Sequence, residues 1–164
     1  MALAVAGGAW WLVPAGDDAG KLEESTKKNE ELVDYRKVFI QAVNDTFASF
    51  LHAGDSLLQL VPSNPSNQQD FEVFMQGINE YGAALAYEKQ YPGVVSNLTD
   101  ATKRMDSLLD LRANRFNYEL EATSKFLEVG QVDFARYRYD NALVLALDED
   151  AQSLEAVGKK FPKE

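Results

Sequence analysis

The sequence predicts an all-α protein, folded as an antiparallel up-down-up-down four-helix bundle with long helices. Residues 21–53 and 94–129 contain neither glycine nor proline, and both stretches repeat apolar residues at spacings of three and four, the period of an α-helix. Glycine and proline instead gather near residues 62–66, 91–93 and 129–131, where short turns favour antiparallel neighbours. A helix of about 36 residues is about 54 Å long and must pack lengthwise against others.

The first helix is expected to begin near Asp17 or Asp18 and to end before Pro62. Gly54 is a place where it can kink or end. Charged side chains lie on the side of this helix opposite to its apolar positions. The apolar positions recur at helical spacing and form a predicted core stripe: Leu32, Tyr35, Phe39, Val43, Phe47, Phe50, Leu57 and Val61.

Ser66 and Gln69 resemble a capping box and predict the start of the second helix, which ends at Tyr91-Pro92-Gly93. Gly77 and Gly82 lie inside this helix, where each glycine costs about 1 kcal/mol relative to alanine. We expect both glycines to be tolerated substitutions in a helix held by packing, with close helix–helix approach as the alternative. The apolar face of this helix consists of Phe71, Phe74, Ile78, Tyr81 and Leu85.

The third helix is expected to run without a break, although Arg112 falls near its apolar seam. A break at residues 112–114 is the alternative, and it would turn the bundle into stacked hairpins. After Gly130 a fourth helix is expected to continue past residues 147–150 to Lys159 and Lys160, cations that suit a helix C-terminus. Its apolar positions are Val132, Ala135, Tyr139, Ala142, Leu143, Ala146, Leu154 and Val157.

From Gly130 onward the sequence resembles part of a tetratricopeptide repeat, with small and aromatic residues at Ala135, Tyr139, Ala142 and Leu143. The resemblance covers about one repeat. The proline that usually follows the second helix of that family is absent, and no second copy at its 34-residue period is found upstream. If it reflects kinship, the resemblance implies stacked helical hairpins that bind a peptide or a protein partner.

Residues 17–164 form a single predicted helical-bundle domain, and residues 1–16 are a separate hydrophobic segment. Met1–Pro14 carries no charged side chain and is shorter than the roughly 20 residues that span a bilayer. We interpret Trp10, Trp11, Leu12 and Val13 as a membrane or partner anchor, because indole rings favour the membrane interface. The segment is then the end of a truncated membrane anchor or signal, or an arm docking on a partner; the alternative is an apolar extension folded on the protein's own core.

Composition excludes several functions. The formal net charge of −10 argues against binding of nucleic acid. The chain has no cysteine and one histidine, His52, so thiol chemistry and histidine-rich metal sites are excluded. No phosphate-binding loop or nucleophile motif is present. The sequence therefore predicts no enzyme, no cofactor, and no catalytic or metal-ligating residue.

Arg136, Tyr137 and Arg138 alternate cation and aromatic ring, and we interpret them as a contact for a protein partner. The predicted function is that of a non-enzymatic helical interaction or structural subunit, tethered to or docked on a membrane-associated complex through its N-terminus. The absence of cysteine favours a location outside the cytoplasm. Two alternatives remain: an extracytoplasmic ligand-sensing bundle of a receptor, and a tetratricopeptide-like peptide-binding adaptor.

Overall fold

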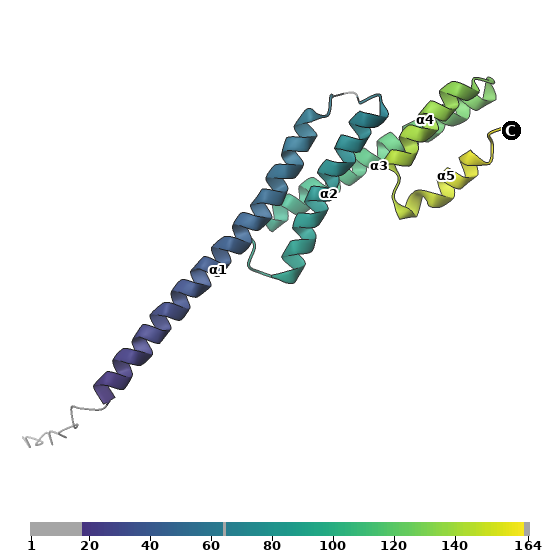
Figure 1. The fold of residues 1–164 in the computed structure, drawn as a ribbon. Helices are drawn as coiled ribbons and strands as arrows, with labels where there is room; N and C mark the ends of the chain where they lie inside the picture. Colours follow the sequence, from purple (N-terminus) through teal and green to yellow (C-terminus); the bar gives the residue numbers. More distant parts are fainter. Residues whose placement is uncertain (1–17, 64, 163–164) are drawn as a thin grey trace, which may run out of the picture. The chain divides into compact units, whose positions relative to one another are not determined.

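The computed structural model describes residues 18–63 and 65–162, with side chains from Leu22 onward. The described residues form helices and no strand, which confirms the predicted all-α helical bundle (Figure 1). None of the helices described is both long and apolar enough to cross a membrane. The elements are α1 (Asp18–Leu60), α2 (Gln68–Gln90), α3 (Leu98–Glu128), α4 (Val132–Leu145), the 3₁₀ turn η1 (Asp148–Asp150) and α5 (Ala151–Gly158).

The chain divides into two compact units, Met1–Gln41 and Ala42–Glu164, and α1 begins in one and ends in the other. In the first unit, apolar side chains of α1 are exposed, including Leu32 at 64%, Tyr35 at 74% and Phe39 at 48%. The prediction that these three residues are core positions is therefore wrong. The physical reason is length, because α2 has 23 residues against 43 in α1 and can cover only about half of it.

In the second unit, α1 and α2 come very close at two glycines. A Cβ atom added to Gly77 would lie 2.8 Å from Leu58 Cγ and 3.3 Å from the backbone oxygen of Gly54. A Cβ on Gly54 would lie 2.7 Å from Tyr81 Cδ2. Close approach is thus the correct interpretation of Gly77, and α1 passes through Gly54 without ending. Gly82 fits the expectation of a tolerated glycine, because its added Cβ would meet only Met105 Cε at 3.9 Å.

The turns fall where proline and glycine predict them. α1 ends before Pro62, and Gly93 and Gly130 both have positive φ angles, 75° and 74°. The start of α2 differs by one residue from the prediction: the N-cap is Asn67, whose side chain accepts a hydrogen bond from the Asp70 backbone N–H at 2.9 Å.

The α2–α3 turn is held by Asn44 of α1. Its Nδ2 donates to the carbonyl oxygen of Val94 at 3.1 Å. Its Oδ1 accepts from the backbone N–H and from the hydroxyl of Ser96, both at 2.8 Å. One amide thereby satisfies polar groups of a turn that forms no regular ladder.

α3 is continuous, as expected, and Arg112 lies inside it with 3% of its surface exposed. The guanidinium forms ion pairs with Glu149 at 3.0 Å and with Asp150. The prediction of one fourth helix is wrong, because α4 ends at Leu145, and η1 and α5 follow. The break has a physical reason: the chain leaves the helix to bring two carboxylates to a buried cation.

The core of the second unit lies where α3 meets the other helices. α3 contacts α2, α4 and α5, and α2 also contacts α4 (Figure 1). Phe47, Ala84 and Ala101 form a smaller cluster with residues of α1, α2 and α3. The larger buried cluster draws on α2, α3 and α4 and contains Phe71, Phe74, Ile78, Tyr81, Leu108, Phe116, Leu120, Ala142 and Leu145.

Candidate functional site

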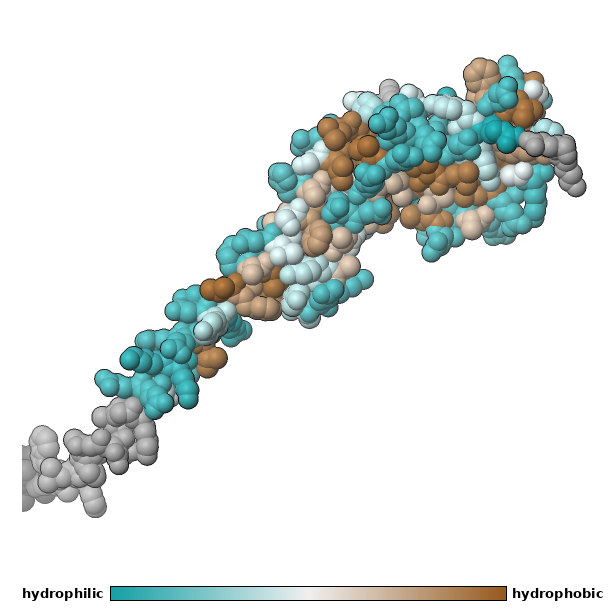
Figure 2. All heavy atoms as spheres, viewed as in Figure 1, coloured by the Kyte–Doolittle hydropathy of each residue, from teal (hydrophilic) through white to brown (hydrophobic). Residues whose placement is uncertain are grey.

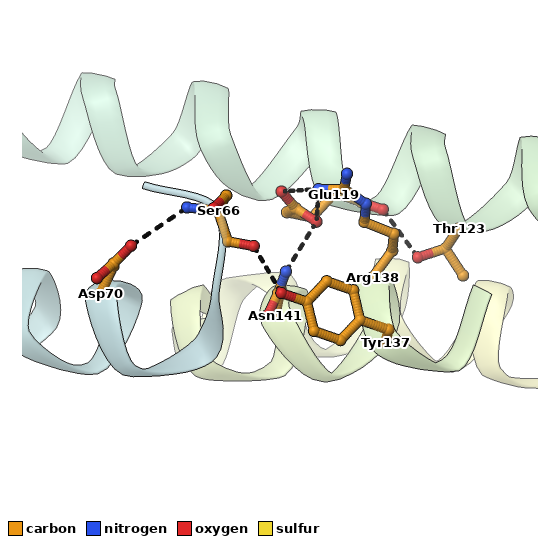
Figure 3. Close-up of polar contacts among 7 residues, drawn as sticks. All are labelled: Ser66, Asp70, Glu119, Thr123, Tyr137, Arg138 and Asn141. Carbon is orange, nitrogen blue, oxygen red and sulfur yellow. Dashed lines mark hydrogen bonds and ion pairs between the residues drawn. The ribbon is translucent and has the colours of Figure 1, made fainter. Parts of the chain in front are cut away.

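A buried carboxylate lies between α3 and α4. Glu119 of α3 is 2% exposed, and both of its oxygens accept hydrogen bonds from Arg138 Nη1 of α4, at 3.1 and 3.2 Å (Figure 3). The Nδ2 atom of the fully buried Asn141 donates to the same carboxylate at 3.3 Å. The Thr123 hydroxyl donates to the Glu119 carbonyl oxygen at 2.8 Å. A charge buried in this way is tolerated because it is both paired and hydrogen-bonded.

Arg138 is the outer member of this network and joins it to aromatic rings. Its side chain is 26% exposed. The guanidinium carbon lies 6.0 Å from the ring centroid of Tyr118 on α3 and 5.9 Å from that of Tyr137 on α4. These separations are within the range of cation–π attraction. The ion pair therefore sets the position of a cation between two aromatic side chains.

Tyr137 also connects α4 to the turn between α1 and α2. Its hydroxyl donates to the backbone oxygen of Ser66 at 2.7 Å (Figure 3). The backbone N–H of Ser66 lies 3.4 Å from a carboxylate oxygen of Asp70 near the start of α2. The ring of Tyr137 is thus fixed at its polar end while 44% of the residue stays exposed.

Beyond Arg138, aromatic and apolar side chains remain exposed where α3 ends and α4 begins. Phe134 is 61% exposed, and its ring stacks on that of Phe126 with centroids 5.6 Å apart. Figure 2 shows hydrophobic residues gathered at this end of the helix pair. We call this surface the α3–α4 patch and define it by Tyr118, Phe126, Val129, Phe134, Tyr137 and Arg138.

The α3–α4 patch is hollowed in two adjoining places. One hollow is lined mainly by α3, and the other mainly by α4. Phe126 and Arg138 line both. Lys125 and Glu121 border the first hollow and pair with each other at 2.6 Å, which lowers the pKa of Glu121 and raises that of Lys125. The surface therefore combines aromatic faces with charges that are already paired.

The structure separates the three residues predicted to contact a partner. Tyr137 and Arg138 lie together in the α3–α4 patch. Arg136 is directed to the C-terminal segment, where its guanidinium carbon is 5.8 Å from the ring centroid of Phe161. The predicted anchor residues Trp10, Trp11, Leu12 and Val13 lie outside the residues that the structure describes.

Sequence reasoning missed Glu119 and the stacked pair Phe126–Phe134. Glu119 follows Arg112 by seven residues, so the two charges lie on one face of α3, among the apolar positions. A carboxylate in that register was a signal of a buried ion pair. The stacking of Phe126 on Phe134 carried no comparable signal, because it depends on how α4 turns back along α3.

Aromatic faces beside a neutralised guanidinium suit the binding of apolar, aromatic or carbonyl groups of another molecule. Comparison with known proteins gives no independent guide, since no family model, no curated protein and no solved structure matches this chain.

Proposed function

We propose that the protein is a non-enzymatic helical interaction subunit that binds a protein partner through the α3–α4 patch. The observation that carries this proposal is the exposure of two aromatic residues of the patch, Phe134 at 61% and Tyr118 at 56%. Interface hot spots are enriched in tyrosine and arginine, and exposed apolar patches with polar rims mark interaction sites. Tyr118, Tyr137 and Arg138 supply these residue types.

Rigidity supports the same proposal. A side chain that becomes ordered only on association reduces the binding free energy by about 0.5–1.5 kcal/mol. Arg138 is already held by Glu119, Tyr137 by Ser66, and Phe134 by its stack on Phe126. The patch is therefore pre-organised, so less conformational entropy is lost when a partner binds.

The test is site-specific photo-crosslinking in the cells that make the protein. A benzophenone amino acid is placed at Phe134 in one variant and at Gln76, an exposed position on α2, in a matched control. The proposal expects a discrete adduct from position 134 that is absent from position 76, and that weakens strongly when Tyr118 is changed to Ala. The proposal is rejected if the two positions give the same adducts or if position 134 gives none.

We further propose that residues 1–16 attach this subunit to a membrane-associated complex outside the cytoplasm. The support is the uncharged stretch Met1–Pro14 with Trp10 and Trp11, followed by an acidic chain without cysteine. Deletion of residues 1–16 should release the protein from carbonate-washed membranes. Unchanged membrane association of the deletion variant would contradict this role.

A further inference from the structure

A third hollow lies in the unit formed by residues 42–164, between the end of α1, the turn after it, α2 and α3. Its volume is about 230 Å³. Phe71 and Phe74, which are 0% and 5% exposed, close its floor. Leu58, Val61, Leu108 and Leu111 form apolar walls, and Leu111 remains 46% exposed at the mouth. The hollow thus has an apolar floor and a mouth that is open to solvent.

Two arginines of α3, Arg104 and Arg115, complete the lining, and none of the described lining residues carries a carboxylate. They are 11 residues apart, about 16 Å along the helix, so they stand at the two ends of the hollow. Arg115 donates to the backbone oxygen of Ser63 at 3.4 Å. This local positive charge is unexpected in a chain whose formal net charge is −10.

Tyr81 of α2 is a polar neighbour of Arg104. The Tyr81 hydroxyl donates to Asp55 at 2.7 Å and also interacts with Arg104. Arg104 forms no ion pair with a carboxylate among the described side chains of 22–63 and 65–162. Its guanidinium therefore retains positive charge at the rim, close to the apolar mouth.

We propose that this hollow binds an acidic segment of a partner protein, which inserts one bulky apolar side chain between Arg104 and Arg115. Size favours a single side chain, because pockets for whole small molecules usually enclose about 300–1,000 Å³. Charge complementarity assigns the flanking residues of the partner as Asp or Glu. This site lies apart from the α3–α4 patch and shares no lining residue with it, so the two can be tested separately.

The experiment measures fluorescence anisotropy of a labelled synthetic peptide, one phenylalanine flanked by three acidic residues on each side, titrated with the full 164-residue chain. Saturable binding is expected, with Kd about tenfold weaker for Arg104→Glu and also for a peptide carrying serine in place of phenylalanine. Arg36→Glu, at an exposed position outside the hollow, makes the same change in net charge and should leave Kd within about twofold. Circular dichroism reports whether Arg104→Glu disturbs folding. Arg104→Lys is the control in that case, because it retains the positive charge and should bind the peptide like the wild type.

Three results would overturn the proposal: no saturable binding to the wild-type chain, equal affinity for the serine peptide, or equal loss in Arg104→Glu and Arg36→Glu. Vesicles containing phosphatidylglycerol provide the remaining comparison. If they bind with the same dependence on Arg104 while the peptide does not bind, the ligand is an anionic lipid surface and the assignment to a peptide is wrong.

Discussion

Arg138 of α4 pairs with the buried Glu119 of α3: Nη1 of Arg138 donates to both oxygens of the carboxylate, and the acid is 2% exposed. The pair therefore sets the register between the two helices at the point where the α3–α4 patch begins. A slide of α4 by one turn would leave the carboxylate buried without its partner.

Replacement of Arg138 by Met should lower the free energy of unfolding by about 3 kcal/mol, because it leaves the Glu119 charge buried and unpaired. Urea unfolding measures this change. The double variant Glu119→Met with Arg138→Met should recover part of the loss, since it removes both charges. A double variant as unstable as the sum of the two single variants would show that the residues do not act as a pair.

Gly77→Ala should destabilise the protein by about 1–2 kcal/mol, because the new methyl group overlaps Leu58 and approaches the Gly54 backbone oxygen. Gly82→Ala is the matched control in the same helix. Its Cβ has room, so the higher helix propensity of alanine should stabilise the protein by up to about 1 kcal/mol. Thermal unfolding of the two variants measures both effects, and equal shifts in Tm would refute the close α1–α2 crossing.

Tyr81 should make stability fall at alkaline pH. Burial, and then its hydrogen bond to Asp55, raise its pKa above the ordinary 10.0, while Arg104 opposes the shift. The unfolded chain therefore loses the tyrosine proton before the folded chain does. The resulting stabilisation is complete below about pH 10 and is lost as pH rises through the raised folded pKa.

Urea unfolding from about pH 8 to about pH 11 measures this dependence. Tyr81→Phe is the comparison, because it removes the titrating group and keeps the ring. The free energy of unfolding should fall less steeply above about pH 10 in the variant than in the wild type. Parallel pH profiles would exclude a contribution from Tyr81.

The two carboxylates of η1 should differ in their importance. Asp150 is 15% exposed at its side chain and faces the buried Arg112, whereas the Glu149 side chain is 73% exposed. Asp150→Ala should cost roughly 3 kcal/mol of unfolding free energy, because the guanidinium loses its buried partner. Glu149→Ala should cost less than about 1 kcal/mol, the usual contribution of an exposed ion pair. Chemical denaturation that ranks the variants in the opposite order would contradict this assignment.

Much of the fold follows from local signals. The ends of several helices are marked by Pro62, Pro92, Gly93 and Gly130, whatever their surroundings. Proline fixes its own φ angle, and glycine can adopt the positive φ seen at Gly93 and Gly130. The sequence also predicts part of the candidate site, because the alternation of cations and aromatic rings points to Tyr137 and Arg138. Phe134 and Tyr118 were not, because their exposure depends on which helix covers them.

By itself, the sequence determined that the chain is helical, where α1, α2 and α3 end, and that α3 continues through Arg112, since helix period and chain breakers act over a few residues. Tertiary structure alone decided the contacts between residues distant in the chain. It left Leu32, Tyr35 and Phe39 exposed, brought Gly77 against α1, ended α4 so that Asp150 could reach Arg112, and gave Glu119 its partner Arg138. The physical reason is that burial and ion pairing depend on which surfaces meet, and a helical period defines a face without naming its partner.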